Sequence, residues 1–267
     1  MTDAHCHPRA LAEFLPGAEE ERRSLGISCA ASSATREEFL YHEELARGAG
    51  QGAPVLPCFA VHPQMPGAGE RLAVYQGPID FAETLAREKR LAAVGEAGFD
   101  LYTPAFRAAE ALQDAVFDAQ ADLALRHGLP LVIHVRRAMH KVFARSAVLR
   151  KLPALIFHSW PGTLGEGEAL LRRGINAYFS FGTVILLNHK EARRCCALFP
   201  AARLLCETDA PYQSLRGREF SRWTDLPLIL RGMAALRGEA GKTAAEPGEL
   251  EKTIDRNFRE AFRGNRI

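Results

Sequence analysis

The chain has 267 residues, of which 47% are hydrophobic and 25% are charged, and its formal net charge is +2. This length and composition suit one large globular domain over residues 1–267, and α/β barrels are commonly of about this size. The net charge is too close to zero to argue for or against a nucleic-acid partner.

The cysteines and the lack of targeting segments indicate where in the cell the protein is expected. Six cysteines are scattered without Cys-x-x-Cys spacing, and the adjacent Cys195 and Cys196 are poorly placed to pair with each other. We therefore expect reduced thiols and a cytoplasmic protein. The N-terminus has no basic-then-apolar signal region, and no apolar run approaches the length of a membrane span. A secreted or membrane protein is therefore not expected.

Apolar strands alternate with helices along the chain. Strands are expected at 3–7, 27–31, 55–61, 91–94, 131–135, 154–158, 177–181 and 204–208. Helices are expected in the polar segment through residue 23 and at 36–47, 81–90, 106–127 and 164–173, followed by a helical C-terminal third with a linker around 238–248. Near-continuous apolar strands between helices predict a parallel sheet, and eight such units predict a (β/α)8 barrel.

The first strand carries the sequence Asp3-Ala4-His5-Cys6-His7. Side chains of an extended strand alternate between faces, so Asp3, His5 and His7 are expected on one face. Cys6 is expected on the other face as a small core residue. Neutral imidazole is the commonest protein ligand for divalent metals. The two histidines therefore predict half of a metal site, whose other ligands must come from elsewhere in the chain.

Metal-competent side chains also stand at the carboxyl ends of later strands. Glu96 is expected just after the fourth strand, within Gly95-Glu96-Ala97-Gly98. The active site of a (β/α)8 barrel is built at this face from several strand ends. Converging imidazoles and carboxylates match a two-metal site, in which one carboxylate bridges the ions and a water between them becomes the nucleophile. The candidates are His5, His7, His62, Glu96, His134, His158 and Asp209.

Five short motifs carry most of these residues. They are Asp3-Ala4-His5-Cys6-His7, Gly95-Glu96-Ala97-Gly98-Phe99-Asp100, His134-Val135-Arg136, Phe157-His158-Ser159-Trp160-Pro161-Gly162 and Glu207-Thr208-Asp209-Ala210-Pro211-Tyr212. Together, and in this order, they resemble the motifs of the TatD-like metal-dependent deoxyribonucleases of the amidohydrolase superfamily. The resemblance spans nearly the whole chain.

The resemblance implies a (β/α)8 hydrolase that cuts DNA phosphodiester bonds at or near an end, with two divalent metal ions. It implies that His5, His7 and Asp209 hold one ion, that His134 and His158 hold the other, and that Glu96 bridges them. A carboxylate at Asp209 can also accept the proton of the attacking water. Zinc, manganese and magnesium all suit a site built from histidines and carboxylates.

The substrate-binding rim is where the chain departs from the family. The family usually has a second histidine at Gln64 and often an acidic residue at Arg137, and its Asn-Glu-Pro after the eighth strand is absent from 216–223. These changes spare the metal ligands. Phosphate contacts are expected from His62, Arg136, Arg216 and Arg218, because cationic side chains bind phosphate oxygens.

Contacts to backbone phosphates carry no sequence information, so we expect little preference for the base sequence of the substrate. Trp160 and Trp223 are expected in loops at the mouth, where they could stack on bases or pack structurally.

Each feature also has a reading without catalysis. Isolated histidines near a terminus or in a core are commonly structural, and Arg136 and His62 could form surface ion pairs. Two other functions remain open: a small-molecule amidohydrolase acting on a lactone or amide, and a metal-binding partner protein that has lost catalysis. Two glycine-containing segments, 165–167 and 241–243, lack the context of nucleotide-binding motifs and are expected to be loops.

Overall fold

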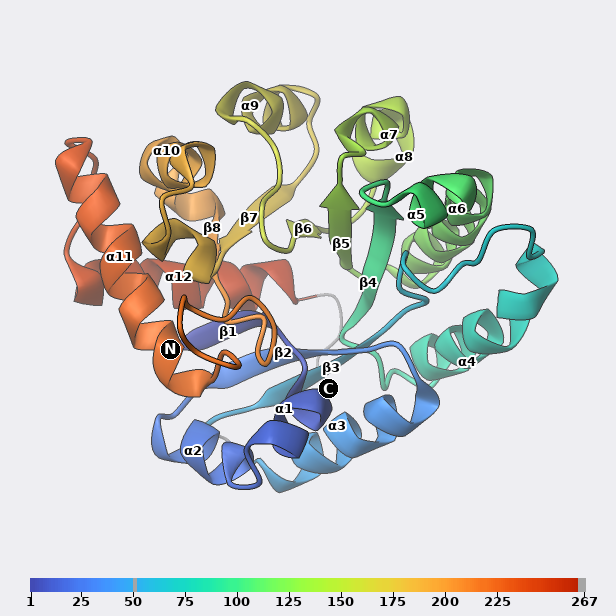
Figure 1. Ribbon diagram of the computed structural model, residues 1–267, viewed down its shortest axis with the longest axis horizontal. Coiled ribbons are helices and arrows are strands. Elements are labelled where there is room, and N and C mark those ends of the chain that lie inside the picture. Colours follow the sequence, from blue (N-terminus) through green and yellow to red (C-terminus); the bar gives the residue numbers. More distant parts are fainter. Residues whose placement is uncertain (50–51, 264–267) are drawn as a thin grey trace.

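Eight parallel strands form one sheet in which each strand pairs with the next along the chain. The structure is a computed structural model that describes residues 1–49 and 52–263. Helices surround the strands on the outside, which is the expected (β/α)8 barrel (Figure 1). The strands are β1 (Thr2–Cys6), β2 (Ser28–Ser33), β3 (Val55–Phe59), β4 (Ala93–Asp100), β5 (Leu131–Arg136), β6 (Leu155–Phe157), β7 (Ala177–Phe181) and β8 (Leu204–Cys206).

The helices follow the strands in sequence. Several begin with recognisable caps: Thr35 and Thr163 each form a capping box with the glutamate three residues later. The α-helices are α1 (Pro8–Phe14), α2 (Ala18–Ser24), α3 (Arg36–Gly48), α4 (Gln76–Arg87), α5 (Pro104–Ala108), α6 (Glu110–His127), α7 (Met139–Ala144), α8 (Ser146–Leu149), α9 (Leu164–Arg172), α10 (Lys190–Leu198), α11 (Leu226–Glu239) and α12 (Pro247–Ala261). None in the described ranges has both the length and the apolar composition to span a membrane.

The first and last strands are joined through side-chain and backbone hydrogen bonds. The buried carboxylate of Asp3 accepts from the backbone N–H and the hydroxyl of Thr208, at 3.0 and 2.6 Å. Further along, the N–H of Asp209 donates to the carbonyl of His5 and that of His7 donates to the carbonyl of Ala210. Asp3 therefore stabilises the closure of the barrel. Strand β1 ends at Cys6, so His7 lies just after the strand in which it was expected.

The end of the barrel opposite the strand carboxyl ends is closed by α12, which lies behind the strands in Figure 1. The aromatic rings of Phe258 and Phe262 pack in one cluster with interior side chains from every strand. Small residues predominate in that cluster because side chains from eight strands must share the narrow interior. The strand residues are Ala4, Ala30, Cys58, Ala93, Val132, Ile156, Tyr178 and Leu205.

Strand β4 is longer than the sequence predicted. It was expected to end at residue 94, but it continues to Asp100, so Glu96 lies within the strand rather than after it. The pairing with β5 shifts in register between Val94 and Ala97 and resumes with Ala97 opposite Ile133, so that Gly98 lies opposite His134. Gly98 has φ +146° and a Cβ added to it would lie 1.9 Å from the carbonyl oxygen of His134. The glycines that obscured this strand in the sequence allow its close approach to β5.

We expect Gly98→Ala to destabilise the fold strongly, because a methyl group would overlap the backbone of β5 at a φ that favours glycine. Overpacking and backbone strain each cost about 1–3 kcal/mol, so the free energy of unfolding should fall by about 2–5 kcal/mol in urea titrations. Gly165→Ala is the matched control, since a Cβ at Gly165 meets nothing within 4 Å. An equal stability of the two variants would contradict this account of β4.

Helix boundaries differ from expectation in several places. The segment through residue 23 is two helices, and the helix expected at 106–127 is divided at Ala109 into α5 and α6. Helix α4 begins at Gln76 rather than at residue 81. The glycines at 165–167 lie in the first turn of α9 and not in a loop, whereas 241–243 lie in the loop before α12, as expected.

All six cysteines are free and buried, in agreement with the expectation of reduced thiols.

Candidate metal centre

The structure brings together the histidines and carboxylates that the sequence singled out. His5 lies on β1, Glu96 on β4 and His134 on β5. The others follow directly or closely after strands: His7 after β1, His62 after β3, His158 after β6 and Asp209 after β8. Because the strands are parallel, their carboxyl ends meet at one mouth of the barrel.

Glu96 is the centre of this cluster, and its two carboxylate oxygens face different imidazoles. Oε2 lies 3.2 Å from Nε2 of His5 and 4.0 Å from Nε2 of His7. Oε1 lies 2.6 Å from Nδ1 of His134 and 3.4 Å from Nε2 of both His62 and His158. One buried carboxylate thus contacts two groups of nitrogen donors on its two sides.

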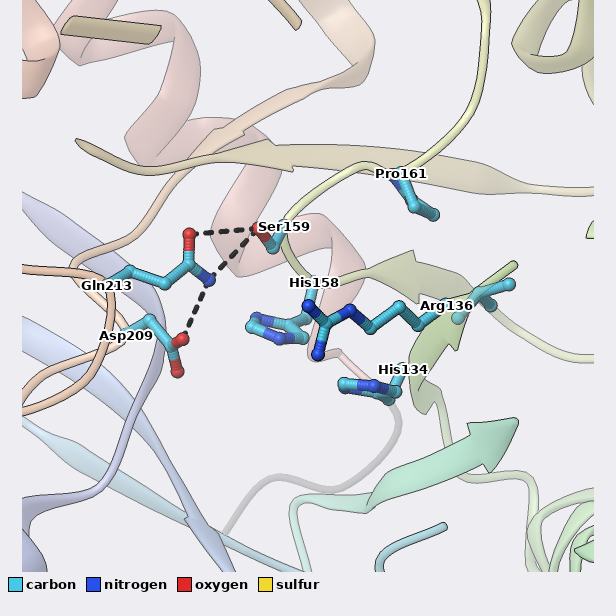
Figure 2. Close-up of a pocket in the computed structure, with 8 residues that line it drawn as sticks. His134, Arg136, His158, Ser159, Pro161, Asp209 and Gln213 are labelled. Atoms are coloured by element: carbon cyan, nitrogen blue, oxygen red, sulfur yellow. Dashed lines mark hydrogen bonds between the residues drawn. The ribbon is translucent and has the colours of Figure 1, made fainter. Parts of the chain in front are cut away.

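Asp209 completes the group around His5 and His7. Its Oδ1 lies 3.5 Å from Nε2 of each histidine. Its Oδ2 accepts a hydrogen bond from the side-chain amide of Gln213 at 2.7 Å, and that amide also contacts the hydroxyl of Ser159 (Figure 2). Gln213 therefore fixes the orientation of the Asp209 carboxylate. Sequence reasoning did not identify Gln213 or Ser159.

Three of the imidazoles also have a ring nitrogen close to a polar side chain other than Glu96. Nδ1 of His5 lies 3.2 Å from the Ser32 hydroxyl, and Nδ1 of His158 lies 3.2 Å from Oε1 of the buried Glu207. Nε2 of His134 lies 3.4 Å from Oδ2 of Asp100. Such partners orient histidine ligands and select their tautomers.

The sequence analysis did not assign these partners. Glu207 and Asp100 lie inside two of the quoted motifs, which was a signal that could have identified them. Ser32 offered no comparable signal, because it lies in a buried strand with no functional motif around it.

The charges of the cluster are strongly coupled. Burial alone would raise the pKa of Glu96, but the imidazoles of His62, His158, His5 and His134 hold it well below its usual value. Burial would likewise lower the pKa of His158, but Glu96, Glu207 and Asp209 raise that pKa to about 10. The Glu96 carboxylate is therefore ionised at neutral pH. A cation that binds at His158 must displace its proton.

The donor set fits a divalent metal. In three overlapping triples the nitrogen and carboxylate-oxygen atoms lie within 4.8 Å of one another. Imidazole nitrogen and carboxylate oxygen suit zinc and manganese, and carboxylate oxygen suits magnesium. His62 belongs to one triple, although the family resemblance did not include it among the metal ligands and it was expected to contact phosphate. The triples are His5 with His7 and Glu96, His62 with Glu96 and His134, and His5 with His158 and Asp209.

A pocket opens directly above the cluster. One part, with a volume of about 510 Å³, is lined by His7, His62, Glu96 and neighbours including Tyr212. A second part, of about 360 Å³, is lined by Ser159, Pro161 and Gln213 and shares several residues with the first. Figure 2 shows His158 between Asp209 on one side and His134 on the other, with the Arg136 side chain extending across it. The shared residues are His134, Arg136, His158 and Asp209.

Four other predicted contacts lie elsewhere. Arg218 forms an ion pair with Asp225, and neither it nor the exposed Arg216 lines the pocket above the cluster. Trp160 and Trp223 are only 4% and 1% exposed, so of the two roles left open by the sequence, stacking on bases and structural packing, the burial supports packing. Trp160 packs against three phenylalanine rings of the core, Phe157, Phe179 and Phe199.

A (β/α)8 barrel with histidines and carboxylates converging at its mouth is the arrangement of metal-dependent hydrolases. The chain belongs to the TatD related DNase family, whose model matches residues 2–263. It is 36% identical over 189 residues to "3'-5' ssDNA/RNA exonuclease TatD" of Pantoea vagans (strain C9-1), covering 67% of this chain and 68% of the relative. DNases are hydrolases of phosphodiester bonds, so membership of this family confirms the enzyme class implied by the sequence motifs.

Solved structures confirm the fold. The TatD homologue YjjV from Escherichia coli K12 has a TM-score of 0.80 at 22% identity, with 98% of each chain covered. A hydrolase of the TatD family from Entamoeba histolytica has a TM-score of 0.75 at 15% identity, with 97% of this chain and 96% of the other covered. The predicted family and barrel therefore agree with both the sequence and the structural comparisons.

Proposed function

We propose that this protein is a metal-dependent exonuclease that removes nucleotides from the 3' end of single-stranded DNA or RNA. The proposal is supported by its relatives, which carry that name, and by one observation at the site: Glu96 presents its two oxygens to two separate groups of imidazoles. A carboxylate placed in this way can bridge two cations. The six free, buried cysteines support a cytoplasmic location.

We assign the two metal positions from the distances around Glu96. His5, His7 and Asp209 accompany Oε2, and His62 and His134 accompany Oε1. His158 lies between the groups, since it contacts Oε1 and its ring centroid is also 3.9 Å from that of His5. When bound, divalent metals would lower the pKa of a water molecule and offset the charge of the phosphate.

The remaining steps belong to protein side chains. Asp209 stays ionised because nearby imidazoles hold its pKa below the usual value against the effect of burial, so it can accept the proton of the attacking water. Gln213 holds that carboxylate in place. Arg136 extends into the pocket and offers N–H groups to the phosphate oxygens of the bound strand.

Treatment with a chelator should abolish the cleavage of single-stranded DNA, and added Mn²⁺, Zn²⁺ or Mg²⁺ should restore it. The substrate should be a 20-nucleotide strand labelled at its 5' end, which shortens stepwise if digestion starts at the 3' end. The same strand labelled at its 3' end should release a labelled mononucleotide at once. Full cleavage by protein shown to contain no metal would contradict the metal-dependent mechanism. Faster hydrolysis of a neutral lactone or ester would favour a small-molecule amidohydrolase.

A further inference from the structure

Two arginines at the rim of the pocket have no negatively charged partner in the part of the chain that the structure describes. Arg136 ends β5 and Arg137 follows it, and both are exposed. Within residues 1–49 and 52–263 neither guanidinium takes part in an ion pair or donates a hydrogen bond. Cationic side chains farther along the same segment differ, because Lys141 and Arg145 contact acidic residues of α6.

The two guanidiniums are instead held by one aromatic ring. The central carbon of the Arg136 guanidinium lies 3.6 Å from the ring centroid of Tyr102, and that of Arg137 lies 4.5 Å from it. Tyr102 is 43% exposed, just past the end of β4. Its backbone is anchored there, since its N–H donates to Asp100 and its carbonyl accepts from Arg107. Cation–π contact explains how two like charges are kept close together.

These three residues form one contact group that begins at the metal-centred pocket and extends beyond its lining. Arg136 lines both parts of the pocket, whereas Arg137 and Tyr102 line neither. The strands that carry them are neighbours, with Asp100 of β4 opposite Arg136 of β5. An anion that reaches from the pocket over this rim would meet both guanidiniums. Two close cations without a carboxylate are a binding site for phosphate oxygens, which a guanidinium can bind through two N–H groups.

We propose that Tyr102, Arg136 and Arg137 form a subsite for the backbone phosphate next to the one at the metal centre. Arg137 binds that second phosphate, Arg136 lies between the two phosphates, and Tyr102 is the positioning residue that holds both guanidiniums. The substrate strand therefore leaves the pocket over the carboxyl ends of β4 and β5. This inference rests on the proposed nuclease function and identifies a strand of at least two linked nucleotides as the ligand.

Binding can be tested without catalysis. The probe is a fluorescein-labelled strand of ten thymidine nucleotides, measured by fluorescence anisotropy in the presence of a chelator. Arg137→Gln should weaken binding about tenfold or more at low salt, because it removes a charge-assisted contact. It should also reduce the slope of log affinity against log salt by about 0.7, the value for one phosphate contact to a single strand. Thymidine monophosphate should bind the variant and the wild type equally.

Arg150→Gln is the matched control. Arg150 is also exposed and has no ion pair in the described part of the chain, but it lies between α8 and β6, at the opposite end of the barrel. The Arg150→Gln variant should bind the strand with the same affinity as the wild type. Tyr102→Leu should weaken binding and Tyr102→Phe should restore it, because the ring rather than the hydroxyl holds the guanidiniums. In the Tyr102→Leu background, Arg137→Gln should cost much less than it does alone.

Two results would overturn the subsite. One is an affinity and salt slope of Arg137→Gln equal to those of Arg150→Gln. The other is displacement of the strand by inorganic phosphate at concentrations similar to the dissociation constant of the strand, which would identify a site for the free ion. Failure of the nuclease function would be recognised separately, as strand binding without metal-dependent cleavage. In that case the subsite would stand and the proposed reaction would not.

Discussion

Glu96→Ala should cause the largest loss of metal of any single substitution at the cluster, together with a large loss of activity. The carboxylate faces both groups of imidazoles, so its removal deprives both proposed metal positions of a ligand. Bound metals are worth several kcal/mol of transition-state stabilisation, and each 1.4 kcal/mol is a factor of ten. We expect cleavage of single-stranded DNA to fall by about 10²–10⁴-fold, and the metal content per chain to fall at both positions.

His134→Ala is the informative comparison, because His134 contacts only the Oε1 side of Glu96. It should reduce occupancy mainly at one position. Metal content would be measured by mass spectrometry after dialysis, and circular dichroism would verify that each variant retains its helices. If Glu96→Ala keeps the metal content of the wild type, Glu96 is not the bridging ligand and the assignment of the two groups is wrong.

Asp209→Asn should reduce turnover while the barrel remains folded. The amide keeps an oxygen that can face His5 and His7, but it cannot accept the proton of the attacking water. Positioned acid–base groups contribute about 10²–10⁴-fold to rate. We therefore expect kcat for single-stranded DNA to fall by that factor, with a much smaller change in strand affinity measured in chelator.

Asp122→Asn serves as the control, since Asp122 is an exposed carboxylate on α6 that pairs with Arg126. Its kcat should equal that of the wild type. Turnover of Asp209→Asn within about twofold of the wild type, at equal metal content, would remove Asp209 from the proton transfer. A parallel loss of metal would instead assign Asp209 chiefly as a ligand.

Much of the site was predictable because a parallel barrel converts positions along the chain into positions in space. Each apolar strand could be recognised by its composition, and the polar residue after it then had to lie at the mouth. His134 and His158 illustrate this: each follows a short buried run, and each contacts Glu96. The same reasoning failed for the bounds of β4, because Gly95 and Gly98 interrupt its apolar pattern while the pairing with β5 continues.

The contacts of a residue were harder to predict where its sequence neighbours do not indicate its environment. Trp160 and Trp223 lie outside strands, and their sequence neighbours do not reveal that core side chains cover them. Arg218 and Arg136 were both expected to contact phosphate, yet Arg218 pairs with Asp225, whereas Arg136 has no acidic partner among the described residues and contacts the ring of Tyr102. The difference depends on residues brought close by folding, and a list of charged residues does not contain it.

The number and order of the strands, the barrel, and the imidazoles and carboxylates at its mouth were all predictable from the sequence. These properties depend on local apolar patterns and on short motifs, both of which can be recognised without knowledge of the fold. Three other properties could be seen only after folding: Asp3 closes the barrel through Thr208, the two oxygens of Glu96 face different histidines, and Arg136 and Arg137 have no acidic partner within residues 1–49 and 52–263. Those facts depend on strand register and side-chain packing, which join residues distant in the chain to within a few ångströms.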